Sequence, residues 1–146
     1  MNRELHIGFK GKNNASCILV KSISANSYLL TNSFDGLKRD IDSLSCSYDS
    51  VILWGIDKNL TDTVRIERIA EKNAKYCSVL NLEKISAQLE AVGIPNYLSD
   101  EPTHYLCNAA YWYLLRKFNG KAVLIHIPSI KNLNGRFIDG IKQVFR

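Results

Sequence analysis

The sequence of 146 residues contains no apolar run that approaches the roughly 18 residues a membrane-spanning helix needs. Its start, MNRELHIGFKGKNN, lacks the long apolar region and the cleavage site of a secretory signal peptide. It has no C-x-x-C pair, and its four cysteines are widely spaced, which argues against a disulfide scaffold and a zinc ribbon. We therefore expect a cytoplasmic protein with reduced thiols, no membrane partner, no metal ion and no cofactor.

Clustered positive charge is also scarce, although the formal net charge is +5. The densest basic groups are RKFNGK and the final IKQVFR, and neither interleaves aromatic residues as a stacking platform for nucleic acid does. Nucleic acid is therefore not an expected partner, and the charge is assigned to a solvated surface.

The arrangement of apolar residues predicts one α/β domain over residues 1–146. Apolar runs of strand length alternate with helical patterns, which is typical of a largely parallel sheet. Strands are expected at residues 4–9, 27–31, 50–55, 64–70, 96–99 and 121–128. Helices are expected at residues 14–23, 35–45, 81–93, from 102 or 103 to 118, and 135–146.

The stretch THYLCNAAYWYLL places a cysteine near the start of a predicted helix. Pro suits a first turn and Thr is a good cap, so this helix should begin near Pro102 or Thr103. Free N–H groups and the helix dipole would then lower the pKa of Cys107 and make it the most reactive of the four thiols. The alternative is a small core residue packed near Leu106 and Ala110. The local sequence leaves both open.

A possible partner is His126, an imidazole inside the otherwise apolar strand VLIHIP. A buried histidine must be paired or must face a site, and a helix followed by a parallel strand brings Cys107 and His126 to one sheet edge. Glu67 in VRIERIA is the candidate third member that orients the imidazole. Its alternative is a surface carboxylate paired with Arg65 or Arg68.

These segments resemble the pyroglutamyl peptidase I (pyrrolidone-carboxylate peptidase) family of cysteine peptidases. The resemblance rests on YLCNAAYWYLL, KAVLIHIP, IERIA and the start LHIGFKGKNNAS. It implies a three-layer α/β/α fold in which Cys107 is the nucleophile, His126 the general base and then acid, and Glu67 the orienting carboxylate. The implied reaction removes an N-terminal pyroglutamyl or related acyl group from a peptide or a small amide or ester.

The same resemblance places the substrate pocket at Phe9, Ile56, Lys58 and Leu106. Phe9 is kept, but the second aromatic residue of the family's pocket is absent. Ile56 stands where the family has glutamine, and no arginine follows the central strand, so Lys58 is the candidate replacement for an arginine that stabilises the oxyanion. The flexible ammonium group of Lys58 cannot reproduce the planar fork of donors that a guanidinium offers.

The chain resembles a shortened and divergent member of the family, because the segment between ERIA and LEKI is reduced. In the family that segment helps to wall the site and to form subunit contacts. The sequence does not decide the oligomeric state, and a homo-oligomer is one alternative. Two functions follow: a cysteine hydrolase, or a non-catalytic or substrate-shifted homologue that acts as a binding or structural protein.

Overall fold

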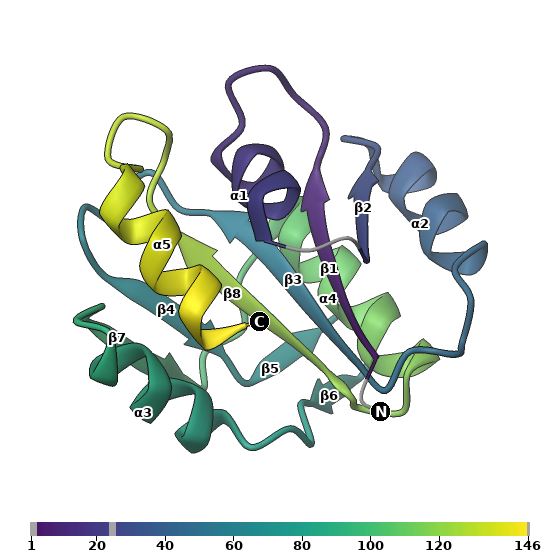
Figure 1. Ribbon diagram of the computed structural model, residues 1–146. Coiled ribbons are helices and arrows are strands. Elements are labelled where there is room, and N and C mark those ends of the chain that lie inside the picture. The colour runs from purple at the N-terminus through teal and green to yellow at the C-terminus, as the bar shows by residue number, and fades with distance from the viewer. Residues whose placement is uncertain (1–2, 24–25, 146) are drawn as a thin grey trace.

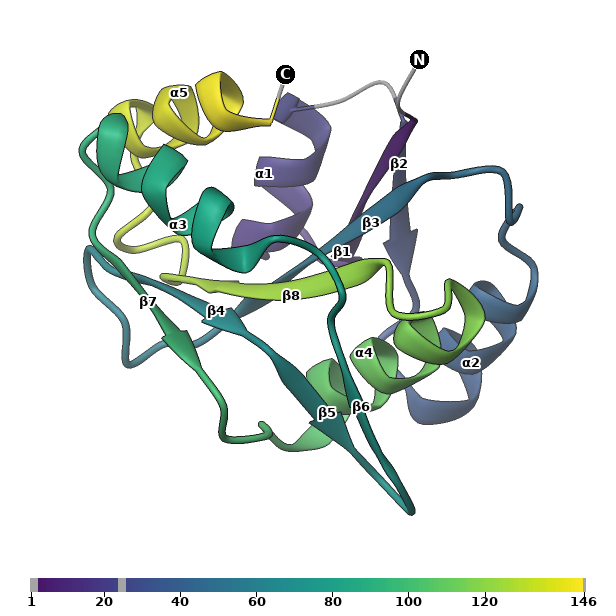
Figure 2. The same cartoon turned by 90° about the horizontal axis from the view of Figure 1, so that it is seen from below.

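A six-stranded sheet lies between two layers of helices in the computed structural model, which describes residues 3–23 and 26–145 (Figures 1 and 2). The strand order is β2-β1-β3-β8-β4-β7. The strands β2, β1, β3 and β8 are parallel to one another, whereas β4 runs antiparallel to β8 and parallel to β7. The predicted mainly parallel three-layer α/β/α fold is confirmed.

The strands of the large sheet are β1 (Glu4–Phe9), β2 (Ser27–Leu30), β3 (Ser50–Ile56), β4 (Val64–Glu67), β7 (Asn96–Ser99) and β8 (Ala122–Ile127). A separate antiparallel hairpin is formed by β5 (Ile69–Glu71) and β6 (Lys75–Cys77). The helices are α1 (Ala15–Ile23), α2 (Phe34–Asp42), α3 (Leu82–Ala91), α4 (Tyr105–Lys117) and α5 (Gly135–Val144).

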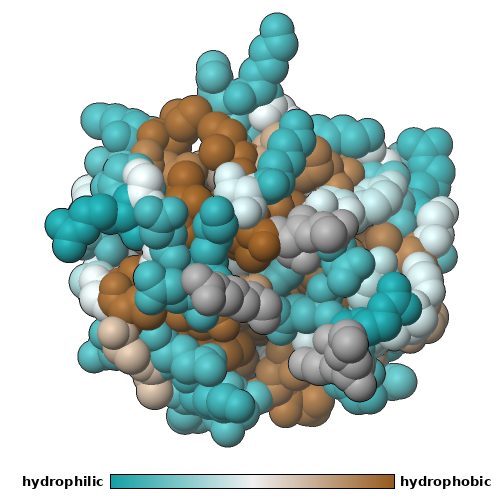
Figure 3. All heavy atoms as spheres, viewed as in Figure 1, coloured by the Kyte–Doolittle hydropathy of each residue, from teal (hydrophilic) through white to brown (hydrophobic). Residues whose placement is uncertain are grey.

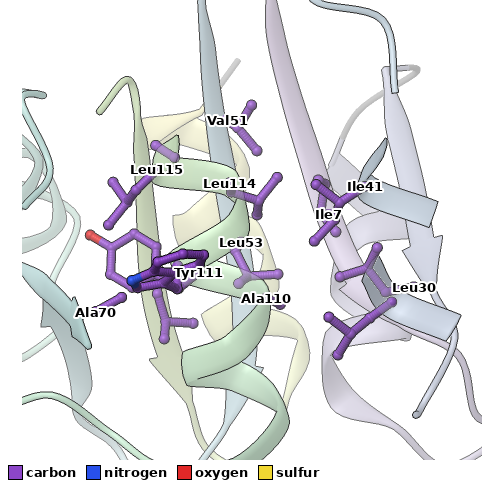
Figure 4. Close-up of a cluster of buried hydrophobic side chains, with 14 of the residues drawn as sticks. Ile7, Leu30, Ile41, Val51, Leu53, Ala70, Ala110, Tyr111, Leu114 and Leu115 are labelled. Atoms are coloured by element: carbon purple, nitrogen blue, oxygen red, sulfur yellow. The ribbon is translucent and has the colours of Figure 1, made fainter. Parts of the chain in front are cut away.

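Helices cover both faces of the sheet, with α2 and α4 on one face and α1, α3 and α5 on the other (Figure 2). Every residue of β8 is therefore buried, which is the pattern of a central strand in a covered sheet. Successive residues of β3 enter different cores: Leu53 packs with Ile7, Leu30 and Tyr111 (Figure 4), while Trp54 packs with the opposite cluster. Over the face shown in Figure 3, polar side chains predominate and apolar ones lie between them.

Several element boundaries differ from the predicted ones. The strand 64–70 is interrupted at Arg68, and the hairpin strand β6 was not predicted because it has only three residues. Helix α4 begins at Tyr105, two or more residues later than expected, with His104 as its N-cap. The prediction for the last helix includes Arg146, which lies outside the described residues.

Asn81 caps α3 as predicted, because its side chain accepts a hydrogen bond from the backbone N–H of Lys84 at 3.0 Å. Within residues 3–23 and 26–145, no helix combines the length and the apolarity needed to cross a membrane.

Candidate active site

The chain brings Cys107, at the start of α4, beside His126, near the carboxyl end of β8 (Figure 1 shows the two elements). Both lie against Gly55, which is paired with His126 across β3 and β8. A β-carbon placed on Gly55 would lie 2.9 Å from Cys107 Sγ and 3.1 Å from His126 Nε2. The sulfur and this ring nitrogen are thus neighbours around one small empty space.

Two polar side chains of α4 hold this helix against β5 and against β4, the strand that carries Glu67. Asn108 donates to the carbonyl of Glu71 at 2.7 Å and accepts from its N–H at 3.1 Å. Tyr111 donates its hydroxyl proton to the carbonyl of Glu67 at 2.8 Å. The asparagine that follows the cysteine is therefore a tether between α4 and β5.

Cys107 is half-buried, and its thiol is protonated in the resting protein. Burial is the largest of the effects that bring the pKa of this thiol to about 11. A hydrogen bond with the backbone N–H of Ile56 lowers the pKa by less, and the charge of Glu67 raises it. The expectation that the helix terminus lowers this pKa is wrong, because desolvation of the thiolate outweighs the dipole. The exposed thiols are Cys46 and Cys77.

Glu67, the predicted third member of the site, lies beside His126. It also forms an ion pair with Arg65, which was the alternative expected from the sequence. Its Oε1 lies 3.6 Å from His126 Nδ1 and accepts a hydrogen bond from Arg65 Nε. The carboxylate is fully buried, and its Oε2 has no hydrogen-bond partner among the described residues. Glu67 Oε1 thus lies against both an imidazole and a guanidinium.

The strand register explains why Arg65 reaches His126. In the antiparallel pair of β4 and β8, Arg65 lies directly opposite His126, while Glu67 lies opposite Leu124. Side chains two residues apart on a strand share a face, so Arg65 and Glu67 both reach toward His126, and Arg65 is the one directly opposite it. Arg65 NH2 reaches His126 Nδ1 at 3.4 Å.

Asp57, which follows β3, completes a charged cluster with Arg65 NH1 at 2.8 Å. Burial acts to raise the pKa of the Asp57 carboxyl, but the Asn59 N–H and the Arg65 guanidinium outweigh it and hold that pKa below 3.8. Burial likewise acts against the charge of Arg65, yet its hydrogen bonds with Glu67 and Asp57 raise the pKa of the guanidinium above its ordinary value. Asp57 and Arg65 are therefore both charged at neutral pH.

An open pocket of about 610 Å³ adjoins this cluster. Of the residues predicted to bind substrate, Ile56 and Lys58 line it, together with His126 and Arg65. Phe9 is only 5% exposed and belongs to a core cluster, against which Leu106 also packs. In the described part of the chain, neither Phe9 nor Leu106 is among the residues that line this pocket.

Other pocket residues were not singled out as site residues from the sequence. Asp57 and Arg65 belong to the charged cluster, and the alternation of VRIERIA was the signal that put Arg65 on the side of Glu67. Tyr105 lines the pocket with a left-handed backbone, at φ 66°, and its side chain is 83% exposed. Such a conformation in a residue other than glycine recurs at functional sites. Nothing in the sequence predicts a left-handed backbone at Tyr105.

Clusters of three or more His, Cys, Asp or Glu side chains that could hold a metal ion are not found in the part of the chain that the structure describes.

Comparison with known proteins identifies the class of fold. No protein-family model matches the sequence, and no curated protein matches it. Solved structures do match: pyrrolidone carboxyl peptidase from Thermococcus litoralis is similar with a TM-score of 0.76 and 22% identity, over 99% of this chain and 91% of that one. The chain therefore has the fold of the pyrrolidone carboxyl peptidases, as its sequence resemblance predicted.

Two further structures agree. The pyrrolidone carboxyl peptidase from Thermus thermophilus gives a TM-score of 0.79 at 15% identity, over 97% of each chain. Pyroglutamyl peptidase I from Bacillus amyloliquefaciens also gives 0.79, at 16% identity, over 99% of this chain and 95% of that one.

Proposed function

We propose that this protein is a cysteine hydrolase, a peptidase or amidase, that removes an N-terminal pyroglutamyl or related acyl group. One observation carries the proposal: Cys107 Sγ and His126 Nε2 lie within 2.9 Å and 3.1 Å of the same point above Gly55. A nucleophile and a base in this proximity, with a carboxylate near the other ring nitrogen, have the arrangement used in covalent acyl transfer. The shared fold with the pyrrolidone carboxyl peptidases supports the same assignment.

The reaction follows from the roles of these groups. His126 Nε2 takes the thiol proton of Cys107, and the thiolate attacks the carbonyl carbon of the scissile bond. The imidazolium then gives its proton to the leaving amine or alcohol, and a thioester of Cys107 remains. Water, deprotonated by His126, attacks the thioester, so the acid leaves and the thiol is restored. Glu67 orients the imidazole and stabilises its charged form.

Backbone N–H groups supply the site for the developing negative oxygen. The first N–H groups of α4 have no intrahelical acceptor, and the side chain of His104 does not cap them. Cys107 is the third residue of this helix, so these donors lie beside the attacking sulfur. Preorganised donors of this kind are worth about 3 kcal/mol each in acyl transfer.

A panel of small chromogenic substrates tests the proposal. Pyroglutamyl, aminoacyl and simple ester substrates are offered to the wild-type protein and to Cys107→Ala. The proposal requires turnover of at least one amide or ester that is lost in Cys107→Ala. Turnover that survives in Cys107→Ala, or its absence with every substrate, would contradict it.

A second candidate function is a non-catalytic or substrate-shifted homologue that binds peptides or serves a structural role. Two observations favour it: the raised pKa of Cys107, and the contacts of the Arg65 guanidinium with both Glu67 and His126. It predicts that panel members bind, as seen by calorimetry, without being cleaved.

The proposal carries a cytoplasmic location. It is supported by Cys46 and Cys77, which are free and exposed, because unpaired surface thiols suit a reducing compartment. The expected partner is a peptide or a small amide or ester that enters the pocket beside His126.

A further inference from the structure

Resting on the proposed function, we infer that Arg65 is a positioning residue that holds His126 in the tautomer unable to accept the proton of Cys107. The observation behind it is the contact between Arg65 NH2 and His126 Nδ1 at 3.4 Å. The same guanidinium donates from Nε to Glu67 Oε1 and from NH1 to Asp57 Oδ2 at 2.8 Å. Arg65 thus contacts both the imidazole of His126 and the carboxylate of Glu67, which is proposed to orient that imidazole.

The direction of the hydrogen bond is fixed by the chemistry of arginine. A guanidinium has five N–H donors and no acceptor, so His126 Nδ1 must accept with its lone pair. A neutral imidazole with a bare Nδ1 carries its proton on Nε2. A proton on Nδ1 would instead point at the N–H groups of Arg65.

The proton on Nε2 lies on the side of the nucleophile. His126 Nε2 and Cys107 Sγ face the same space beside Gly55, whereas Nδ1 faces Arg65 and Glu67. An N–H at Nε2 can donate toward the sulfur but cannot take its proton. The resting site is therefore a thiol beside an imidazole that cannot act as its base.

Base function requires Arg65 to leave Nδ1. His126 Nδ1 then gains a proton from water and Nε2 gives one up, with no net change in charge, and the new Nδ1–H turns to Glu67 Oε1, now 3.6 Å away. Arg65 has room for such a movement, because its side chain is 18% exposed and lines the open pocket. A ligand in that pocket meets the guanidinium that controls the base.

The tautomer is measured directly on the wild-type protein by long-range ¹H–¹⁵N correlation NMR at neutral pH. The signals of His126 are identified by their loss in His126→Gln. We expect a neutral ring with its proton on Nε2. A proton on Nδ1, or an imidazolium, would overturn the inference without any variant of Arg65 being needed.

Arg65→Gln provides the second test, in which electrostatics and tautomer control predict opposite results. Loss of a nearby positive charge should by itself make the Cys107 thiolate rarer. Loss of the contact with Arg65 should instead let the His126 proton move from Nε2 to Nδ1. His126 could then accept the thiol proton, and the rate of Cys107 alkylation by iodoacetamide should rise at least about tenfold. Cys46, exposed and remote in sequence, is the internal standard in the same mass map.

Arg68→Gln is the matched control, because Arg68 carries the same charge but pairs with Glu83 and Asp100 at the surface. It should leave the tautomer and the alkylation rate unchanged. Equal effects of Arg65→Gln and Arg68→Gln, or slower alkylation in Arg65→Gln, would refute the inference. A tautomer that shifts in Arg65→Gln while no panel substrate is hydrolysed would end the proposed function and leave this inference standing.

Discussion

Gly55 is paired with His126 across β3 and β8, and the absence of a side chain on Gly55 is what lets Cys107 approach the imidazole. A β-carbon there would stand 2.9 Å from the sulfur and 3.0 Å from the ring carbon Cδ2. Contacts this short force a displacement of either side chain. The geometry of the site thus depends on a residue that takes no part in its chemistry.

Gly55→Ala is therefore expected to separate Cys107 from His126. We expect a loss of about 1–3 kcal/mol in the free energy of unfolding, as for other overpacked sites, and at least about a 100-fold loss of any Cys107-dependent turnover. Urea denaturation and the substrate panel measure the two effects. Gly135→Ala is the matched control, because a β-carbon at Gly135 would meet nothing within 4 Å. Similar losses in both variants would contradict the steric explanation.

The raised pKa of Cys107 predicts a loss of stability at high pH. Below pH 9.0, the ordinary pKa of the thiol, Cys107 is protonated in both the folded and the unfolded chain. Between pH 9.0 and about 11 the unfolded chain loses this proton and the folded chain keeps it, so ionisation favours unfolding. The free energy of unfolding should fall by about 2 kcal/mol across this window.

The comparison with Cys107→Ala isolates that contribution, because Tyr111, whose pKa is also raised by burial, is present in both proteins. Denaturation curves at a series of pH values give the difference between the two. Parallel pH profiles would show that the thiol of Cys107 is not desolvated in the folded protein.

The left-handed backbone of Tyr105 predicts an unusual order of stability. At a positive φ glycine is favoured over alanine by about 1 kcal/mol, so Tyr105→Gly should be more stable than Tyr105→Ala by that amount. Phe34 is the control: it is also the exposed first residue of a helix, but without a positive φ, so there the alanine variant should be the more stable. The same order at both positions would contradict the strained conformation.

Pyroglutamyl substrates should be poor ones. Ile56 lines the pocket where the resemblance places a glutamine, and Phe9 lies in the core, so the pocket offers little for a polar lactam ring. We expect kcat/KM for pyroglutamyl amides to lie at least about 100-fold below that of the best aminoacyl or ester substrate. Ile56→Gln should narrow the gap and Ile56→Leu should not. A pyroglutamyl amide as the best substrate of the panel would contradict this prediction.

Much of the fold could be predicted because its signals are local. The apolar runs of β1, β3 and β8 and the spacing of α3 follow from periodicity, and the order of elements implies the layers. The reversed direction of β4 could not be predicted, because it depends on the partner that the strand meets. The hairpin of β5 and β6 is too short to carry a pattern.

The sequence by itself determined which residues could do chemistry: a cysteine in a first helical turn, a histidine in an apolar strand, and a carboxylate that shares a strand face with an arginine. His6 is as buried as His126, but both of its ring nitrogens have partners, Trp54 at 3.0 Å and Glu4 at 3.1 Å. Only the tertiary structure decided that difference, because hydrogen-bond partners come from distant strands.

The register between β4 and β8 was likewise decided only in three dimensions. It places Arg65, and not Glu67, opposite His126. A shift of two residues would exchange the arginine and the carboxylate at that position while leaving the apolar residues on their own faces. Alternation along a strand fixes the face of each side chain, but its neighbour across the sheet is set by the packing of the whole domain. The state of the candidate base depends on that neighbour.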